Sequence, residues 1–285
     1  MIIEITFIIY YILTLHVNSV YRVEVPIMEI LEKEDTDILF IALRLVNVPG
    51  VMKQVASILA EYNVNILSGI IYGPSDSPES LWIFSADFTN SKAPPEVILD
   101  KIRKLDVVLS CEYGVKKMGK MLFPPYFIEL NILGMGAIIE RRRWLQEVNK
   151  VILEEFGSGA EALFFHVGFR AGYRIVEYWT EASGLKGKNL IVLALEVMKG
   201  LNWISDYSVE RIDLIKPDVL FRVWNLMDCS PFKGKEKRAT SQYFRGILSG
   251  FISRIIGKHV ILKETKCIAK GDPYCEFSTG DISEV

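Results

Sequence analysis

The apolar positions in the first half of the chain alternate between strand and helix periods. Apolar runs of strand length, each bounded by residues typical of turns, occur at 38–45, 66–72, 81–88 and 107–113. Between them, Val51, Val55 and Leu59 recur at helical spacing, and Pro94-Pro95 opens a second helix. The pattern predicts the order strand, helix, strand, strand, helix, strand.

The second half of the chain carries longer helical patterns. Apolar residues recur at helical spacing over 138–156, 160–181 and 189–199, between strand-like runs at 126–133, 203–212 and 219–227. Gly168 and Gly172 stand four residues apart in the second of these helices, where small residues let another backbone or a ligand approach. With 285 residues, the chain is long enough for two domains. We therefore predict an α+β protein, with an antiparallel sheet and helices in its second domain.

The first half resembles the ACT domain, a ferredoxin-like βαββαβ regulatory module that binds amino acids. The resemblance rests on the element order and on Asn47-Val48-Pro49-Gly50 at the first strand-to-helix turn, and it covers residues 36–116. It implies side-by-side pairing into a homodimer, with the ligand between this turn and the second strand of a neighbour, here Leu67-Ser68-Gly69. An acidic residue often stands at the position of Asn47, so a retained fold with an emptied site is the alternative.

The second half resembles the 4-vinyl reductase domain, which is shared with the sensory domains of aromatic-responsive bacterial activators. A glycine-marked helix at 241–251 is followed by Glu264, Cys267 and Cys275, and these positions carry the resemblance over residues 126–280. The small subunits of a vesicle-tethering complex have a related fold. The two resemblances leave residues 1–35 as an N-terminal extension and 117–125 as a linker.

The same stretch predicts a metal site. Two thiols and a carboxylate around the Gly271-Asp272-Pro273 turn are ligands that suit zinc. In the aromatic sensors of the family, zinc is held by three cysteines and a glutamate, and the matching positions are the four residues Ser241, Glu264, Cys267 and Cys275.

A serine hydroxyl stays protonated near neutral pH and is a poor zinc ligand, so the first thiol is missing at Ser241. Cys229 lies in a turn after a strand-like run and is our candidate for the missing thiol, although water could also complete the site. We expect a structural zinc ion on Cys229, Glu264, Cys267 and Cys275. The alternatives are reduced, buried cysteines and an exposed disulfide.

Aromatic residues near small ones predict a pocket for a flat or chain-like apolar guest in the second domain. The candidate lining residues are Phe164, His166, Phe169, Tyr173, Trp203, Trp224, Tyr243 and Phe244. The alternative is an ordinary aromatic core, in which His166 is a hydrogen-bonded core histidine.

Composition and charge narrow the classes of function. A net charge of -2 offers no global attraction to nucleic acid. No phosphate-binding loop, dinucleotide-binding fingerprint or nucleophile elbow is present. Four cysteines without a secretory leader favour the cytoplasm, and the apolar first 15 residues are too few for a membrane span. Three glutamines beside 68 charged residues suggest a thermophilic source.

These observations together predict a small-molecule-sensing regulatory protein rather than an enzyme. An amino acid, or a small apolar or aromatic ligand, would favour one arrangement of a homodimer, and a protein partner would receive the signal. The alternatives are a reductase-type enzyme and an assembly adaptor of the vesicle-tethering kind.

Overall fold

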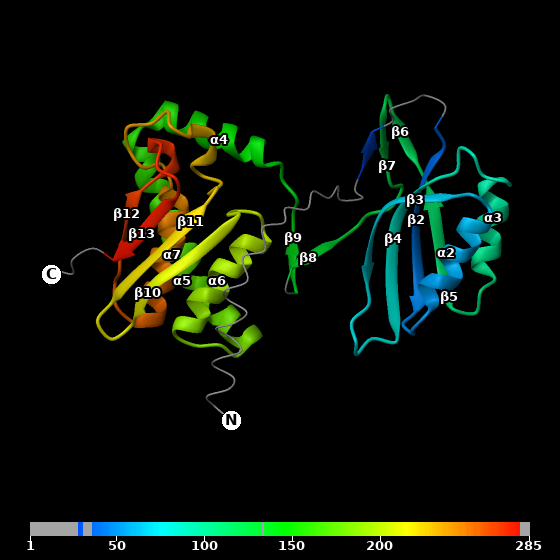
Figure 1. The fold of residues 1–285 in the computed structure, drawn as a ribbon, viewed down its shortest axis with the longest axis horizontal. Coiled ribbons are helices and arrows are strands. Elements are labelled where there is room, and N and C mark those ends of the chain that lie inside the picture. The colour runs from blue at the N-terminus through cyan, green and yellow to red at the C-terminus, as the bar shows by residue number, and fades with distance from the viewer. Residues whose placement is uncertain (1–27, 31–35, 133, 280–285) are drawn as a thin grey trace. The chain divides into compact units, whose positions relative to one another are not determined.

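The computed structural model describes residues 28–30, 36–132 and 134–279. The chain divides into two compact units, Met1–Glu129 and Leu130–Val285, and each is described by itself (Figure 1). The predicted N-terminal extension over residues 1–35 lies almost entirely outside the described residues.

The first unit has the predicted βαββαβ order. Its elements are β2 (Ile38–Val46), α2 (Val51–Glu61), β3 (Asn65–Tyr72), β4 (Glu79–Asp87), α3 (Pro95–Arg103) and β5 (Val108–Gly114). The strands form one antiparallel sheet in the order β3-β4-β2-β5. Apolar residues of β2 and β4 pack against α2 and α3, with Leu43, Leu59 and Leu99 fully buried between the layers. The sequence prediction of this module is confirmed.

A small additional sheet also belongs to the first unit. It joins β1 (Glu29–Ile30), β7 (Met121–Phe123) and β6 (Lys116–Met118) in the order β1-β7-β6. Leu122 of β7 packs with Ile38 and Phe40, whose side chains form a cluster separate from the main core. Residues 117–125, which the sequence suggested as a linker, thus contain a hairpin whose turn is made by Gly119 at φ 59°.

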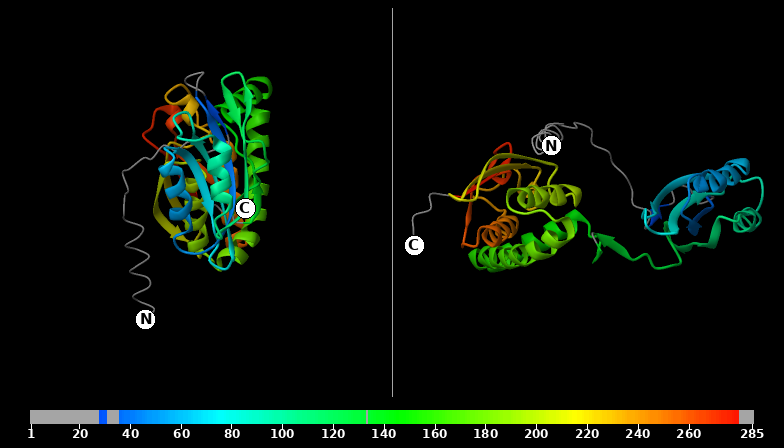
Figure 2. Two further views of the ribbon diagram at one scale, coloured as in Figure 1. Left: turned by 90° about the vertical axis from the view of Figure 1, so that its right-hand side faces the viewer. Right: turned by 90° about the horizontal axis from the view of Figure 1, so that it is seen from below.

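The second unit combines a hairpin, four helices and a four-stranded sheet (Figure 2). Its elements are β8 (Leu130–Ile132), β9 (Met135–Ala137), α4 (Arg142–Phe156), α5 (Ser158–Ser183), α6 (Lys188–Gly200), β10 (Asp206–Asp213), β11 (Asp218–Trp224), α7 (Gln242–Ile256), β12 (Leu262–Lys266) and β13 (Cys275–Thr279). The sheet is antiparallel in the order β10-β11-β13-β12. Short 3₁₀ turns lie at Ser230–Phe232 and Ile268–Lys270.

Two strands of the second unit differ from the sequence prediction. The run at 126–133 was expected to be one strand, but only Leu130–Ile132 pairs, and it pairs with β9 alone. The strand predicted at 219–227 ends at Trp224 because Asn225 takes a left-handed backbone, φ 52°, that a strand does not allow.

Helices α5 and α7 approach so closely that their backbones touch. A Cβ atom at Gly172 would lie 2.0 Å from the backbone oxygen of Ile247, and one at Gly250 would lie 2.0 Å from the backbone oxygen of Phe169. Only glycine fits at these contacts. The small residues that sequence spacing placed on one face of α5 therefore receive another backbone, and the two helices form one rigid layer beneath the sheet.

Candidate functional site

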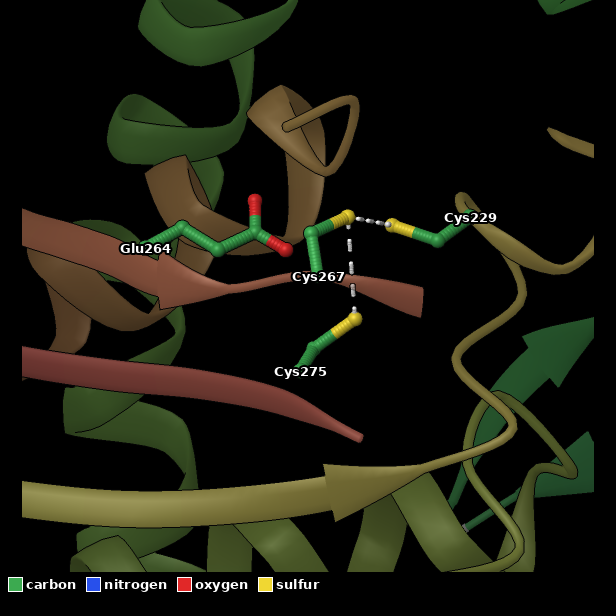
Figure 3. Close-up of side chains that lie close together, drawn as sticks. All are labelled: Cys229, Glu264, Cys267 and Cys275. Carbon is green, nitrogen blue, oxygen red and sulfur yellow. Dashed lines mark hydrogen bonds between the residues drawn. The ribbon is translucent and has the colours of Figure 1, made fainter. Parts of the chain in front are cut away.

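Four candidate metal ligands come together in the second unit. The ligand atoms of Cys229, Glu264, Cys267 and Cys275 all lie within 4.8 Å of one another (Figure 3). Cys229 lies in the turn after β11, Glu264 on β12, Cys267 directly after β12, and Cys275 at the start of β13. All three cysteines are fully buried. The structure thus brings together the four residues that the sequence suggested.

Local backbone geometry fixes the thiols in place. Asp272 accepts a hydrogen bond from the backbone N–H of Cys267 at 2.8 Å, and its own N–H donates to the Cys267 oxygen at 3.2 Å. Gly271, at φ 98°, ends the 3₁₀ turn and lets the chain return toward Cys275. The N–H of Gly234 donates to the oxygen of Ile268, which ties the segment after Cys229 to the same turn.

The separations of the donor atoms suit a tetrahedral metal ion. The Cys267 Sγ lies 3.4 Å from the Cys229 Sγ and 4.0 Å from the Cys275 Sγ. Zinc–sulfur bonds of about 2.3 Å at tetrahedral angles place neighbouring sulfurs about 3.8 Å apart. All three thiols are free, and their separations exceed the roughly 2.05 Å of a disulfide. The exposed-disulfide alternative is therefore wrong for this structure.

Glu264 leaves one oxygen without a partner. Its Oε2 accepts a hydrogen bond from the Ser241 hydroxyl, whereas its Oε1 is buried and has no hydrogen-bond partner among the described residues. In Figure 3 the carboxylate points toward the Cys267 sulfur. A buried carboxylate oxygen without a partner is costly unless it is protonated or binds a cation.

The electrostatics of the cluster also favour a cation. Hydrogen bonds from Cys229 and Cys275 hold the pKa of the Cys267 thiol well below its usual range. Burial raises the pKa of Cys229. Burial, and then the negative charge of Cys267, raise the pKa of Glu264 to about 8. The cluster holds acidic groups that repel one another when ionised, and a bound dication would stabilise their charged forms.

Ser241 acts on the cluster through Glu264. It directly precedes α7, is fully buried, and donates its hydroxyl hydrogen bond to the Glu264 carboxylate. Its neighbour Thr240 donates to the Cys229 Sγ at 3.3 Å. The residue at the position of the missing thiol therefore orients a ligand, while Cys229 supplies the third sulfur from another segment.

A cavity of about 240 Å³ lies at the other end of α7. Its lining consists of Phe169, Tyr173, Ser253, Gly257, Lys258 and His259. The Phe169 ring is stacked with the Tyr173 ring at 6.3 Å and lies 5.1 Å from the His259 ring, measured between ring centroids. Lys258 and His259 are exposed, so the cavity opens at the surface.

The other candidate pocket residues lie elsewhere in the second unit. Phe244 belongs to the core, with its ring 5.4 Å from that of Phe277. Trp203 contacts Tyr243, and Trp224 contacts Tyr274. Phe164 is half-buried, and neither it nor His166 lines the cavity.

His166 is exposed on α5, so the core-histidine alternative is wrong for this residue. Lys258 and His259 were missed from the sequence, because their only signal was their place after Gly257, which ends α7.

The candidate residues of the first unit lie on a turn and on an edge strand. Gly50, at φ 88°, precedes α2, and Val48 and Pro49 beside it are exposed. The Asn47 side-chain amide donates to the backbone oxygens of Pro74 and Ser77 at 2.8 and 2.9 Å. Asn47 therefore anchors the loop between β3 and β4.

The second half of the expected amino-acid site lies on β3. Leu67 is exposed, the Ser68 and Ser85 hydroxyls lie 2.9 Å apart, and a Cβ atom at Gly69 would come within 2.8 Å of the Phe84 Cβ. Strand β3 is an edge strand, and β4 separates it from β2 in the sheet. The turn that follows β2 and the middle of β3 thus belong to strands that are not neighbours.

Comparison with known families defines the class of protein. The sequence matches the ACT domain family over residues 40–107 and the 4-vinyl reductase domain family over residues 228–280. The chain therefore carries an ACT domain and a 4-vinyl reductase domain, and both resemblances drawn from the sequence are confirmed. The first unit is called the ACT unit below, and the second the vinyl-reductase unit.

Individual relatives are distant. An uncharacterized protein of Methanocaldococcus jannaschii is 23% identical over 123 residues, which cover 42% of this chain and 65% of that protein's length. Among solved structures, the phenol-responsive sensory domain of the transcription activator PoxR, solved with phenol, is 15% identical, with a TM-score of 0.45 over 57% of this chain and 83% of that one.

Two further solved structures each match part of the chain. A vinyl-4-reductase family protein of M. jannaschii is 17% identical, with a TM-score of 0.38 over 52% of this chain and 85% of that one. The ACT domain of a Chlorobium tepidum GTP pyrophosphokinase is 15% identical, with a TM-score of 0.24 over 28% of this chain and 99% of that one. None of the helices described has the length and apolar character that crossing a membrane requires.

Proposed function

We propose that this protein is a small-molecule-sensing regulatory protein whose 4-vinyl reductase domain contains a structural metal ion and binds a small aromatic guest. The course of α7 carries the proposal. Ser241 at its start contacts Glu264 of the metal cluster, and Ser253 and Gly257 at its end line the cavity. The helix has 15 residues and is about 22 Å long, so one rigid element joins the two sites.

The metal ion is zinc in this proposal, and its role is structural. Three thiolates and one carboxylate match the preference of zinc for sulfur with one harder ligand. Cys229, Glu264, Cys267 and Cys275 would fill a tetrahedral shell, whereas catalytic zinc sites keep one position open for water or substrate. The ion would hold the turn after β11 against the β12–β13 hairpin. Free thiols in such a cluster suit a reducing compartment, which we propose is the cytoplasm.

The guest is an aromatic molecule with a single ring and an anionic group. A cavity of roughly 150 Å³ can hold benzene in another protein, and this one has about 240 Å³. Phe169 and Tyr173 offer ring faces, and Lys258 at the rim offers a positive charge that would orient a carboxylate.

The ACT domain would contribute pairing and a second input. In this proposal two copies of the chain associate through the first unit, and an amino acid binds where the Asn47–Gly50 turn of one copy meets Leu67–Gly69 of the other. The separation of the two segments within a single sheet supports a site that needs two copies. Differential affinity for two dimer arrangements would then pass the signal to a protein partner.

Thermal unfolding of the full chain, purified without added metal, tests the aromatic site. We expect benzoate and phenol to raise the melting temperature of the second unit, as binding to the native state alone requires. Lys258→Gln should remove most of the benzoate shift and keep the phenol shift, and His166→Ala, a change on α5 outside the cavity, should alter neither. The proposal fails if neither probe shifts the transition of the wild-type protein.

Native mass spectrometry of the same preparation tests the metal. One zinc ion per chain is expected. A metal-free protein with unchanged stability would leave the cysteines as packed apolar side chains.

A further inference from the structure

Helix α4 contacts its own domain with polar side chains. Arg142 donates to the backbone and side-chain oxygens of Asn202. Gln146, one turn further along, donates to the backbone oxygen of Met227 and to the Ser230 hydroxyl. These contacts fix which side of the helix faces the domain, since residues four apart share one face.

The opposite side of α4 is apolar and exposed. Trp144 is 57% exposed, Val148 37% and Val151 53%, and Leu145 beside them is also exposed. No residue of this helix is buried. An apolar helix face is normally the one that packs on a core, so α4 presents to solvent the face that usually finds a partner.

Charged residues close both ends of this apolar face. Arg141 stands seven residues before Val148, and Glu155 stands seven residues after it. Seven residues are nearly two helical turns, so all three side chains point the same way. Arg141, Trp144, Val148, Val151 and Glu155 alternate steps of three and four, the spacing of a helix-pairing seam. Neither Arg141 nor Glu155 forms an ion pair within the described part of the chain.

We propose that α4 pairs with α4 of a second copy of the chain, antiparallel and around a two-fold axis at Val148. In that register Arg141 of each copy lies opposite Glu155 of the other, Trp144 opposite Ile152, and Leu145 opposite Val151. A two-fold interface must be complementary to itself. The arrangement of opposite charges at equal distances from Val148 meets that requirement, and it gives two ion pairs per interface.

The charges also select this occupant over others. A parallel pair would place arginine against arginine and glutamate against glutamate, which is unfavourable. An anionic membrane would attract the three arginines at 141–143 and repel Glu154 and Glu155 at the other end of the same face. This interface involves only the second unit and does not depend on the proposed pairing of ACT domains.

Disulfide trapping in the full chain tests the axis. In Val148→Cys, the new thiols of two copies would face each other, so oxidised glutathione should convert most of the protein to a covalent dimer on a non-reducing gel. Lys150→Cys lies on the side of α4 away from the seam and should give no more dimer than the wild-type protein, which reports the background from the native cysteines. Equal cross-linking of the two variants, or none in either, overturns the proposal.

Charge exchange in the Val148→Cys protein tests the register. Arg141→Glu alone and Glu155→Arg alone should each reduce the rate of dimer formation several-fold, because each places like charges opposite each other. The double variant should restore the rate. Two single losses without restoration would overturn the antiparallel register. So would binding to vesicles of anionic phospholipid by a chain that never cross-links, an outcome that would make α4 a membrane-surface helix.

Discussion

The two units of this chain are stabilised by different kinds of interior. The ACT unit has a core of apolar side chains, and its candidate ligand residues lie on an exposed turn and an edge strand. The vinyl-reductase unit places three thiols, a carboxylate and a serine hydroxyl inside its fold, and its two central helices touch backbone to backbone. The first unit can therefore reach its folded state with side-chain packing alone. In the second, stability depends on what occupies a polar cluster.

Metal removal should have the largest effect and should act on one unit only. Structural zinc contributes about 10 to 16 kcal/mol to folding in small peptides, so a chelator or Cys267→Ser should strongly lower the stability of the vinyl-reductase unit. Trp82 is the single tryptophan of the ACT unit, and its fluorescence should report an unchanged transition there. Cys111→Ser, a change at the half-buried free cysteine of the ACT unit, is the matched control. A chelator without effect on the transition of the vinyl-reductase unit would remove the distinction between the two interiors.

Truncation in the apolar core should reverse the pattern. Leu59 of α2 is fully buried, and Leu59→Ala should cost about 2 to 5 kcal/mol through lost contacts and a cavity. Met52→Ala, on the exposed side of the same helix, should cost much less. Urea unfolding followed at Trp82 measures both changes, and bound metal should stay constant. Loss of metal in Leu59→Ala would mean that the two units do not unfold independently.

The sequence was sufficient where one physical rule decides the outcome. The ACT unit followed from apolar periods, since β2 must bury Ile41, Leu43 and Leu45 against two helices. Cys229 was identified as the missing thiol because Ser241 is a poor ligand and a turn after a strand can reach a site on the next strands. The cluster in the structure contains that cysteine.

The aromatic cavity could not be predicted, because its walls depend on how separate elements pack. Phe169 and Tyr173 reach it only through the close contact between α5 and α7. Trp224 follows Val223 on β11, so the two side chains point to opposite faces of the sheet. Val223 is buried with Phe244 in the core, and Trp224 instead contacts Tyr274. Strand parity alone could have separated Trp224 from the other candidates.

The backbone contact between α5 and α7 gives the next largest effect. Gly250→Ala would place a methyl group 2.0 Å from the Phe169 oxygen, which forces the helices apart at a cost of about 3 kcal/mol. Gly159→Ala in α5, where nothing lies within 4 Å, should be neutral or stabilising by up to about 1 kcal/mol. Calorimetry of the vinyl-reductase unit compares the two. Equal stabilities would mean that the helices adjust without strain and that the glycines are not required.

The pH dependence of metal binding should show the smallest effect and should be confined to the vinyl-reductase unit. Burial and the neighbouring Cys267 charge raise the pKa of Glu264 to about 8, so below that pH the carboxyl group carries a proton that the metal must displace. One displaced proton changes affinity about tenfold per pH unit, and the affinity therefore rises with pH up to about 8 and gains nothing further from this residue above it.

Protons on the thiols add to the slope in every variant, so Glu264→Gln isolates the carboxyl group. Competition with a chromogenic zinc chelator between pH 6 and 9 should give a slope for the wild type that exceeds the slope for Glu264→Gln by one proton below pH 8 and equals it above. Identical slopes across the whole range would mean that Glu264 is ionised before metal arrives. The cluster would then resemble the ACT unit in one respect, since its folded geometry would not depend on a bound ion to accommodate a buried charge.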